Sequence, residues 1–120
     1  MKTLLIVDDE TKLCQFLSRF FEARGFRTLT AHSGQEALER LNDSAPDCLL
    51  LDLRMPDLSG LEVLKLAKAK FPQLTVVVVS ALDDPQTVET AFRLGANDYI
   101  PKPLSFDQRD WARAFFAADN

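Results

Sequence analysis

"LLIVDDE", residues Leu4–Glu10, is the stretch that decides the fold: four apolar residues end abruptly in three acids. A run that is apolar throughout is typical of a strand covered on both faces, as in a parallel sheet. Neighbouring carboxylates repel one another, and the repulsion grows as the local dielectric constant falls. The acids are therefore either solvated or arranged to hold something positive.

Further apolar runs along the chain predict a five-stranded sheet. The strong runs are Thr3–Val7, Cys48–Leu51, Thr75–Val79 and the short Asp98–Ile100, and a weaker run starts at Phe26. The runs do not alternate between apolar and polar residues, so both faces of the sheet are expected to be covered.

Helical patterns fall between the predicted strands. Leu13, Phe16, Leu17 and Phe20 share one helical face, and Gly25 is placed to end that helix. Ser33 and Glu36 form a capping-box pair at the start of a second helix.

The remaining helices are marked by their ends. A third is expected from Gly60 to Phe71, stopped by Pro72. Asp84–Pro85 reads as an N-cap followed by the first helical residue, opening a helix that carries Val88, Ala91, Phe92 and Gly95. A fifth helix is predicted from about Ser105. Strand and helix thus alternate five times, which predicts an α/β fold with a doubly wound parallel sheet in one domain, 1–120.

Composition narrows the class of protein. The net charge of −4 argues against direct nucleic-acid binding, and the 47% hydrophobic content is enough for a true core. Four apolar residues near the start are too few for a signal peptide or a membrane span, so we expect a cytoplasmic protein. Cys14 and Cys48 lie in apolar surroundings without metal-ligand spacing, and we expect both to be buried, reduced thiols.

Polar residues follow the strong strands. These residues are Asp8 and Asp9, then Asp52, then Ser80 and finally Lys102. Ligands of open α/β sheets bind outside the carboxyl ends of the strands, so all five are expected to meet at one cleft. Each alone could be structural, for example Asp9 as a helix cap. Three carboxylates together exceed what one lysine compensates, and a hard divalent cation such as Mg²⁺ would resolve the conflict.

Four motifs in this order are similar to the receiver domains of two-component response regulators. They are the "DD" of residues 8–9, "LLLDLRMPDLSG" at 49–60, "VVVVSA" at 76–81 and "DYIPKPL" at 98–104. The resemblance covers nearly the whole chain and implies a flavodoxin-like sheet of order 2-1-3-4-5 with five helices.

The resemblance also implies a set of metal ligands. Asp9 and Asp52 would bind Mg²⁺ directly, the backbone carbonyl of Arg54 would be a third protein ligand, and Asp8 would act through a metal-bound water.

By the same resemblance, Asp52 accepts a phosphoryl group from the phosphohistidine of a sensor histidine kinase or a phosphotransfer protein. Lys102 would pair with the phosphoryl oxygens and Ser80 would donate its hydroxyl to one of them. Tyr99 matches the family's switch aromatic, which would rotate inward and repack the partner surface. Such a protein is a switch that catalyses only its own phosphorylation and dephosphorylation, as a monomer or as a phosphorylation-dependent dimer, with an effector that the residues do not identify.

Details around the site carry further expectations. Pro56 keeps Met55 out of helical geometry, and Gly60 is expected to allow a turn that a side chain would hinder. A cis bond at Lys102–Pro103 is expected by resemblance. Leu82 could shield the acyl phosphate from water.

Two other features are less closely tied to the site. Trp111, Phe115 and Phe116 could pack inward on the fifth helix or form an exposed partner patch, and packing is favoured. His32 is the only histidine and is expected at the surface, away from the cleft.

Three alternatives stay open. A phosphorylation-independent interaction module would need a vestigial acidic site, although all five positions are filled. An aspartate-nucleophile phosphatase would carry an Asp-x-Asp motif after the first strand, which "VDDE" does not provide. A flavin-binding protein would cradle a phosphate in that loop, where Asp8, Asp9 and Glu10 would repel it.

Overall fold

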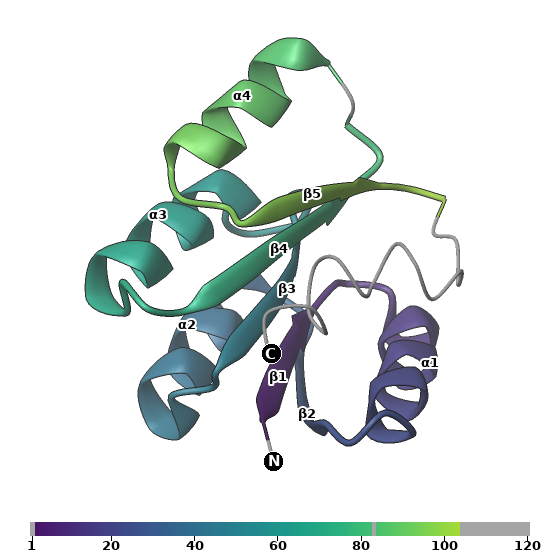
Figure 1. The fold of residues 1–120 in the computed structure, drawn as a ribbon. Coiled ribbons are helices and arrows are strands. Elements are labelled where there is room, and N and C mark those ends of the chain that lie inside the picture. Colours follow the sequence, from purple (N-terminus) through teal and green to yellow (C-terminus); the bar gives the residue numbers. More distant parts are fainter. Residues whose placement is uncertain (1, 83, 104–120) are drawn as a thin grey trace.

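Five parallel strands alternate with helices in the computed structural model, which describes residues 2–82 and 84–103. The elements are β1 (Thr3–Val7), α1 (Thr11–Glu22), β2 (Arg27–Ala31), α2 (Gly34–Ser44), β3 (Cys48–Asp52), α3 (Gly60–Lys70), β4 (Thr75–Ser80), α4 (Pro85–Arg93) and β5 (Asp98–Pro101). The strand order is β2-β1-β3-β4-β5, which confirms the predicted topology (Figure 1). The expected fifth helix and its aromatic residues lie outside the described residues.

The helices form two layers around the sheet. Helix α1 covers one face, while α2, α3 and α4 cover the other (Figure 1). Successive residues of a strand point to opposite faces, so Leu4 and Ile6 pack with α1 whereas Leu5 and Val7 pack toward α2 and α3. This is why the strands are apolar throughout.

The predicted inner face of α1 is only partly right: Leu17 is buried, and Leu13 and Phe20 pack against the core, but Phe16 does not. Cys14, Leu17 and Phe21 are the buried residues of this helix, whereas Phe16 is 54% exposed. Phe21 packs edge-to-face on Phe26, with ring centroids 5.6 Å apart. Phe21 is fully buried and Phe20 only partly, so the buried stripe runs through i, i+3 and i+7 from Cys14. Apolar residues on both stripes left the sequence ambiguous.

Phe92 on α4 was also expected to be buried, but it is 45% exposed. Only Ala91 of this helix is buried, with 0% exposure. A short helix at the edge of the molecule buries a narrow stripe, and a small residue lets it approach the sheet.

The helix starts follow the predicted chemistry with one change. Asp84 accepts a hydrogen bond from Thr87 N and Pro85 is the first helical residue, as predicted. Ser33 accepts from Glu36 N, but the Glu36 carboxylate accepts from His32 N rather than from Ser33. The capping box is therefore displaced by one residue. Residue Glu10, not Asp9, precedes the first residue of α1.

Two further observations concern the described part of the chain. Cys14 and Cys48 are buried thiols rather than disulfide partners, which confirms the prediction. No helix there has the length and apolar character needed to cross a bilayer.

Candidate functional site

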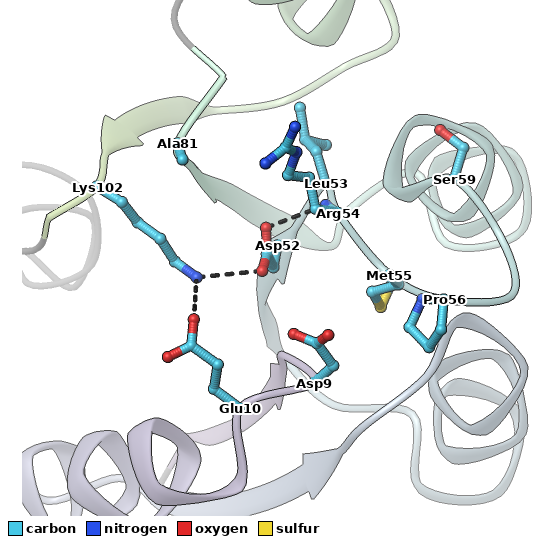
Figure 2. A pocket seen from close by; sticks show the side chains of 10 residues that line it. All are labelled: Asp9, Glu10, Asp52, Leu53, Arg54, Met55, Pro56, Ser59, Ala81 and Lys102. Carbon is cyan, nitrogen blue, oxygen red and sulfur yellow. Dashed lines mark hydrogen bonds and ion pairs between the residues drawn. The ribbon is translucent and has the colours of Figure 1, made fainter.

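The carboxyl ends of the strands meet at one edge of the sheet. The parallel register pairs Val7 with Leu51, Asp52 with Val79 and Ser80 with Pro101, so strand ends distant in sequence lie next to one another. A cleft of about 610 Å³ opens at this edge. Its lining is shown in Figure 2 and comprises Asp9, Glu10, Asp52, Leu53, Arg54, Met55, Pro56, Ser59, Ala81 and Lys102.

Three carboxylates converge at this edge: Asp9 and Asp52 line the cleft, and Asp8 lies next to them. Asp8 and Asp52 are only 3% and 5% exposed, whereas Asp9 is exposed. One oxygen from each of the three lies within 4.8 Å of the others. Asp9 accepts no hydrogen bond from any described residue, which leaves its oxygens available to a ligand.

Lys102 follows β5, the edge strand of the sheet, and its side chain contacts the acids. Its Nζ lies 2.9 Å from Asp8 Oδ2, 3.1 Å from Asp52 Oδ2 and 3.4 Å from Glu10 Oε1. Figure 2 shows the ammonium group pointing into the cleft between Asp52 and Glu10. The structure therefore brings Asp8, Asp9, Asp52 and Lys102 together as predicted. Glu10 was not predicted to bond Lys102, although its position directly after the two aspartates could have indicated a role in the site.

The ionisation of the site reflects this crowding. Burial raises the pKa of Asp52 above its ordinary value, and the negative charge of Asp8 adds to the effect. Burial alone would lower the pKa of Lys102, but its bonds to Asp8 and the charge of Asp52 outweigh that cost, so its pKa is raised. One cation shared among several acids stays charged, while the acids remain incompletely neutralised.

Ser80 and Tyr99 meet through the backbone of Leu82. Ser80 is fully buried at the end of β4, and its Oγ accepts a hydrogen bond from Leu82 N at 3.0 Å. Tyr99 on β5 is half-buried, and its hydroxyl donates to the Leu82 carbonyl oxygen. The sequence indicated both side chains but gave no sign that one residue connects them.

The loop after β3 carries the remaining cleft residues. Arg54 N donates to Asp52 Oδ1 at 3.1 Å, which orients the carboxylate. Gly60 N donates to Leu53 O at 3.0 Å and closes the loop. Pro56 lies in a non-helical segment, as predicted, and the Lys102–Pro103 peptide bond is cis, as expected from the family resemblance.

A side chain at Gly60 would hinder the end of this loop, as predicted, and the cause is close packing rather than the backbone conformation of the glycine. Its backbone does not have the positive φ found at Gly25 and Gly95. Instead, a Cβ at this position would lie 2.4 Å from Leu53 Cα and 2.7 Å from Asp52 O. Glycine is required because the start of α3 packs directly on the backbone of the Asp52 loop.

His32 lies closer to the site than expected. Its Nδ1 is 3.1 Å from the Asp8 carbonyl oxygen, and Cys14 Sγ donates to the same oxygen at 3.3 Å. Both side chains thus contact the backbone of the acidic loop, and neither lines the cleft. The parallel register of β1 and β2, which ends at Val7 and Ala31, brings His32 next to Asp8.

The donor set fits a hard divalent cation. Carboxylate oxygens are the ligands that Mg²⁺ takes in proteins, usually one or two of them together with water. Asp9 and Asp52 offer such oxygens at the cleft, and the loop holding Arg54 forms its wall. The described residues that line the cleft include no cysteine or histidine, so a softer metal is not favoured.

Buried acids facing a lysine, at the carboxyl edge of a sheet of order 2-1-3-4-5, define the class of receiver-type signalling switches. The family model for the response regulator receiver domain matches residues 4–110. The chain belongs to this family, the receiver domains of two-component response regulators, which act as phosphoacceptor switches rather than as conventional enzymes.

Individual relatives agree with this assignment. The DNA-binding transcriptional regulator NtrC of Klebsiella pneumoniae is 39% identical over 86% of this chain, which spans 22% of that protein. The crystal structure of NtrX from Brucella abortus is 32% identical, with a TM-score of 0.87 over 98% of this chain and 28% of that one. The response regulator TrrA from Thermotoga maritima, solved in complex with Mg(2+)-BeF, is 29% identical, with a TM-score of 0.82 over 92% and 95% of the two chains. The chain thus spans about a fifth of the length of the curated relatives it matches.

Proposed function

We propose that Asp52 is the phosphoacceptor of this receiver domain and takes its phosphoryl group from a phosphohistidine on a sensor histidine kinase or a phosphotransfer protein. One observation carries the proposal: a buried carboxylate at the end of β3 faces the cleft and accepts a hydrogen bond from Lys102. In the transfer, an oxygen of Asp52 forms the new P–O bond as the P–N bond of the phosphohistidine breaks. The electron pair of that bond stays on the histidine nitrogen, and the product is an acyl phosphate.

The protein contributes position and charge to this reaction. Phosphoryl transfer needs in-line placement of donor and acceptor and compensation of the charge on the equatorial oxygens. Arg54 N and Lys102 Nζ each bond a different oxygen of Asp52 and so fix the plane of its carboxylate. Lys102 Nζ lies between Asp52 and Glu10. Its positive charge can therefore stay close to the negative charge as that charge moves from the Asp52 carboxylate to the phosphoryl oxygens.

We propose that Mg²⁺ is held by Asp9, Asp52 and the backbone carbonyl of Arg54, with Asp8 acting through water. The metal would supply positive charge that neutralises the phosphoryl oxygens. Support comes from the proximity of the three carboxylates and from the Mg(2+)-BeF complex of the relative TrrA. Asp8 is suited to an indirect role because it is buried and, unlike Asp9 and Asp52, is not among the residues that line the cleft.

The switch would use the Ser80–Leu82–Tyr99 connection. In this proposal Ser80 turns its hydroxyl toward a new phosphoryl oxygen and gives up the hydrogen bond that it accepts from Leu82 N. Leu82 then becomes free to move, and its carbonyl is the partner of the Tyr99 hydroxyl. Phosphorylation at Asp52 would thereby change the packing of Tyr99 and the surface around α4 and β5.

The decisive experiment is incubation with acetyl phosphate and Mg²⁺ followed by intact-protein mass spectrometry. We expect a mass increase of one phosphoryl group, absent without Mg²⁺ and absent in Asp52→Asn. An adduct that persists in Asp52→Asn would assign the acceptor to another residue. The alternative of a phosphorylation-independent module is not favoured, because each of the five positions of the acidic site is filled by the required residue type.

The effector is a matter for proposal as well. NtrC is a DNA-binding transcriptional regulator, and this chain matches only its receiver portion. We therefore propose that this receiver domain works in the cytoplasm and controls a DNA-binding effector of that kind. The charge of the chain does not favour direct contact with nucleic acid.

A further inference from the structure

The start of α2 is capped by a residue from a different loop. Asp57, between β3 and α3, accepts hydrogen bonds from Gly34 N at 2.9 Å and from Gln35 N at 3.0 Å. The two bonds use different carboxylate oxygens, and the partners are 22 and 23 residues away in the sequence. A carboxylate at this position also interacts favourably with the positive end of the helix.

The remaining amides of the first turn are bonded locally. Glu36 N donates to Ser33 Oγ and Ala37 N donates to the Ser33 carbonyl oxygen. Ser33 therefore accepts the hydrogen bonds of the Glu36 and Ala37 amides, and Asp57 accepts those of the Gly34 and Gln35 amides. Removing either cap weakens the same helix, but only removal of Asp57 also detaches the loop after β3.

The loop sits directly on the helix at this point. A Cβ added at Gly34 would lie 2.6 Å from Leu58 Cβ, so only glycine permits the contact. The pKa of Asp57 lies below its ordinary value because the amides of Gln35, Gly34 and Leu58 donate to its carboxylate. Geometry and charge thus agree that the capped state is the stable one.

The same loop forms a wall of the cleft. Arg54, Met55, Pro56 and Ser59 all line it (Figure 2). The two ends of the loop are fixed by the bond from Arg54 N to Asp52 and by the bond from Gly60 N to Leu53 O. Asp57 lies between these ends and fixes the middle of the loop to α2.

We infer that Asp57 is a positioning residue for the metal site: by clamping the loop to α2, it holds the Arg54 carbonyl where a divalent cation needs it. The inference rests on the proposed function, because it assumes that Arg54 contributes a ligand. It adds a dependence that the site residues do not show, namely that the start of α2 helps to set the affinity of the cleft for Mg²⁺.

The test is an Mg²⁺ titration of the full chain followed by NMR of the Arg54 and Met55 amides. We expect Asp57→Ala to bind Mg²⁺ about tenfold more weakly, the lower end of the loss caused by removing an outer-shell partner. Asp57→Asn keeps an acceptor oxygen and should fall between. Ser33→Ala is the matched control: it uncaps the same helix without touching the loop, and its Mg²⁺ affinity should stay at the wild-type value.

Two additional readouts separate positioning from general loss of structure. In metal-free protein, the Gly60 amide should exchange with solvent faster in Asp57→Ala but not in Ser33→Ala. At saturating Mg²⁺, the phosphorylation rate of Asp57→Ala by acetyl phosphate should return to near the wild-type rate.

Several outcomes would overturn the inference. Wild-type affinity in both Asp57 variants would do so while leaving the phosphoacceptor assignment intact, and so would an equal loss of affinity in Ser33→Ala. Failure of the wild-type chain to bind Mg²⁺ or to form an adduct would remove the proposed function and the inference together. If Asp57→Ala does not fold, Asp57→Asn decides, and an unchanged affinity counts against the clamp.

Discussion

Lys102 Nζ lies 3.1 Å from Asp52 Oδ2, although the two residues are 50 positions apart in the chain. The contact spans the sheet from the end of β3 to the segment after β5. Lys102 also bonds Asp8 and Glu10, so one ammonium group serves three carboxylates while Asp9 lies alongside. Without a further cation the site holds more negative charge than it can neutralise, and this imbalance leads to the first prediction.

Asp52→Asn should stabilise the metal-free protein, since burial raises the pKa of the Asp52 carboxyl and so disfavours its charged form. The substitution removes a charge whose burial is unfavourable, and Lys102 keeps Asp8 as a partner. Urea unfolding in the presence of a chelator measures the effect. Asp9→Asn, at an exposed position, should change the stability less.

The pH dependence has a definite sign. Because the pKa of Asp52 is raised in the folded protein, the native state binds a proton more readily than the unfolded chain does. The contribution of this group to the free energy of unfolding therefore falls as the pH rises from the ordinary carboxyl pKa through the raised value. Asp52→Asn should lack this component. A stability difference between the two proteins that does not vary with pH would contradict the explanation.

Lys102→Met should destabilise the metal-free protein by about 3 kcal/mol, since it leaves two buried carboxylates without their cation. Mg²⁺ should recover part of this loss, because it supplies positive charge to the same acids. Urea unfolding with and without Mg²⁺ tests both statements. The exposed Lys65→Met is the control and should show neither effect.

Tyr99→Phe should cost about 1 kcal/mol, because it removes the hydroxyl that donates to the Leu82 carbonyl. It should also alter the NMR signals of Leu82 in the unphosphorylated protein while leaving Mg²⁺ affinity unchanged. A shift of the Mg²⁺ dissociation constant in this variant would show that the metal site and the tyrosine are more directly connected than the contacts indicate.

The sequence was sufficient for the fold because its strands are apolar on both faces and its polar residues gather at strand ends. Asp8, Asp9, Asp52 and Lys102 could be placed together since parallel strands bring their carboxyl ends to one edge. The sheet order follows from the family resemblance and agrees with the pairing in the structure. These are consequences of pattern, which a single sequence displays.

Contacts between loops were not predictable in the same way. The cap that Asp57 provides to α2, the support of Asp8 by His32 and the close packing of Gly60 all depend on tertiary positions. A single aspartate or glycine in a loop has several ordinary roles, and spacing does not separate them. The prediction that Phe16 lies on the inner face of α1 failed for a different reason. Phe16 and Phe21 belong to two different apolar stripes, and packing against Phe26 selects the stripe of Phe21.

Leu82→Ala should shorten the lifetime of the acyl phosphate. Leu82 is half-buried and follows Ala81, which lines the cleft. A smaller side chain at this position would admit attacking water more easily. The decay of the phosphorylated mass after removal of acetyl phosphate measures the lifetime, and an unchanged half-life would exclude a shielding role for Leu82.

Gly60→Ala should be among the most damaging substitutions of a small residue. The added Cβ would meet backbone atoms of Leu53 and Asp52 at 2.4 and 2.7 Å, and backbone cannot move aside as a flexible side chain can. We expect a loss of roughly 2–3 kcal/mol in the free energy of unfolding, in the upper range for overpacked sites.

Gly25→Ala is the matched control: its φ of 93° is unfavourable for alanine, but a Cβ there meets nothing within 4 Å. That variant should lose only about 1 kcal/mol and keep its Mg²⁺ affinity, whereas Gly60→Ala should weaken Mg²⁺ binding because the clash displaces the backbone that orients Asp52. Equal stability losses in the two variants, or normal Mg²⁺ binding by Gly60→Ala, would show that the start of α3 can move away from the Asp52 loop without disturbing the site.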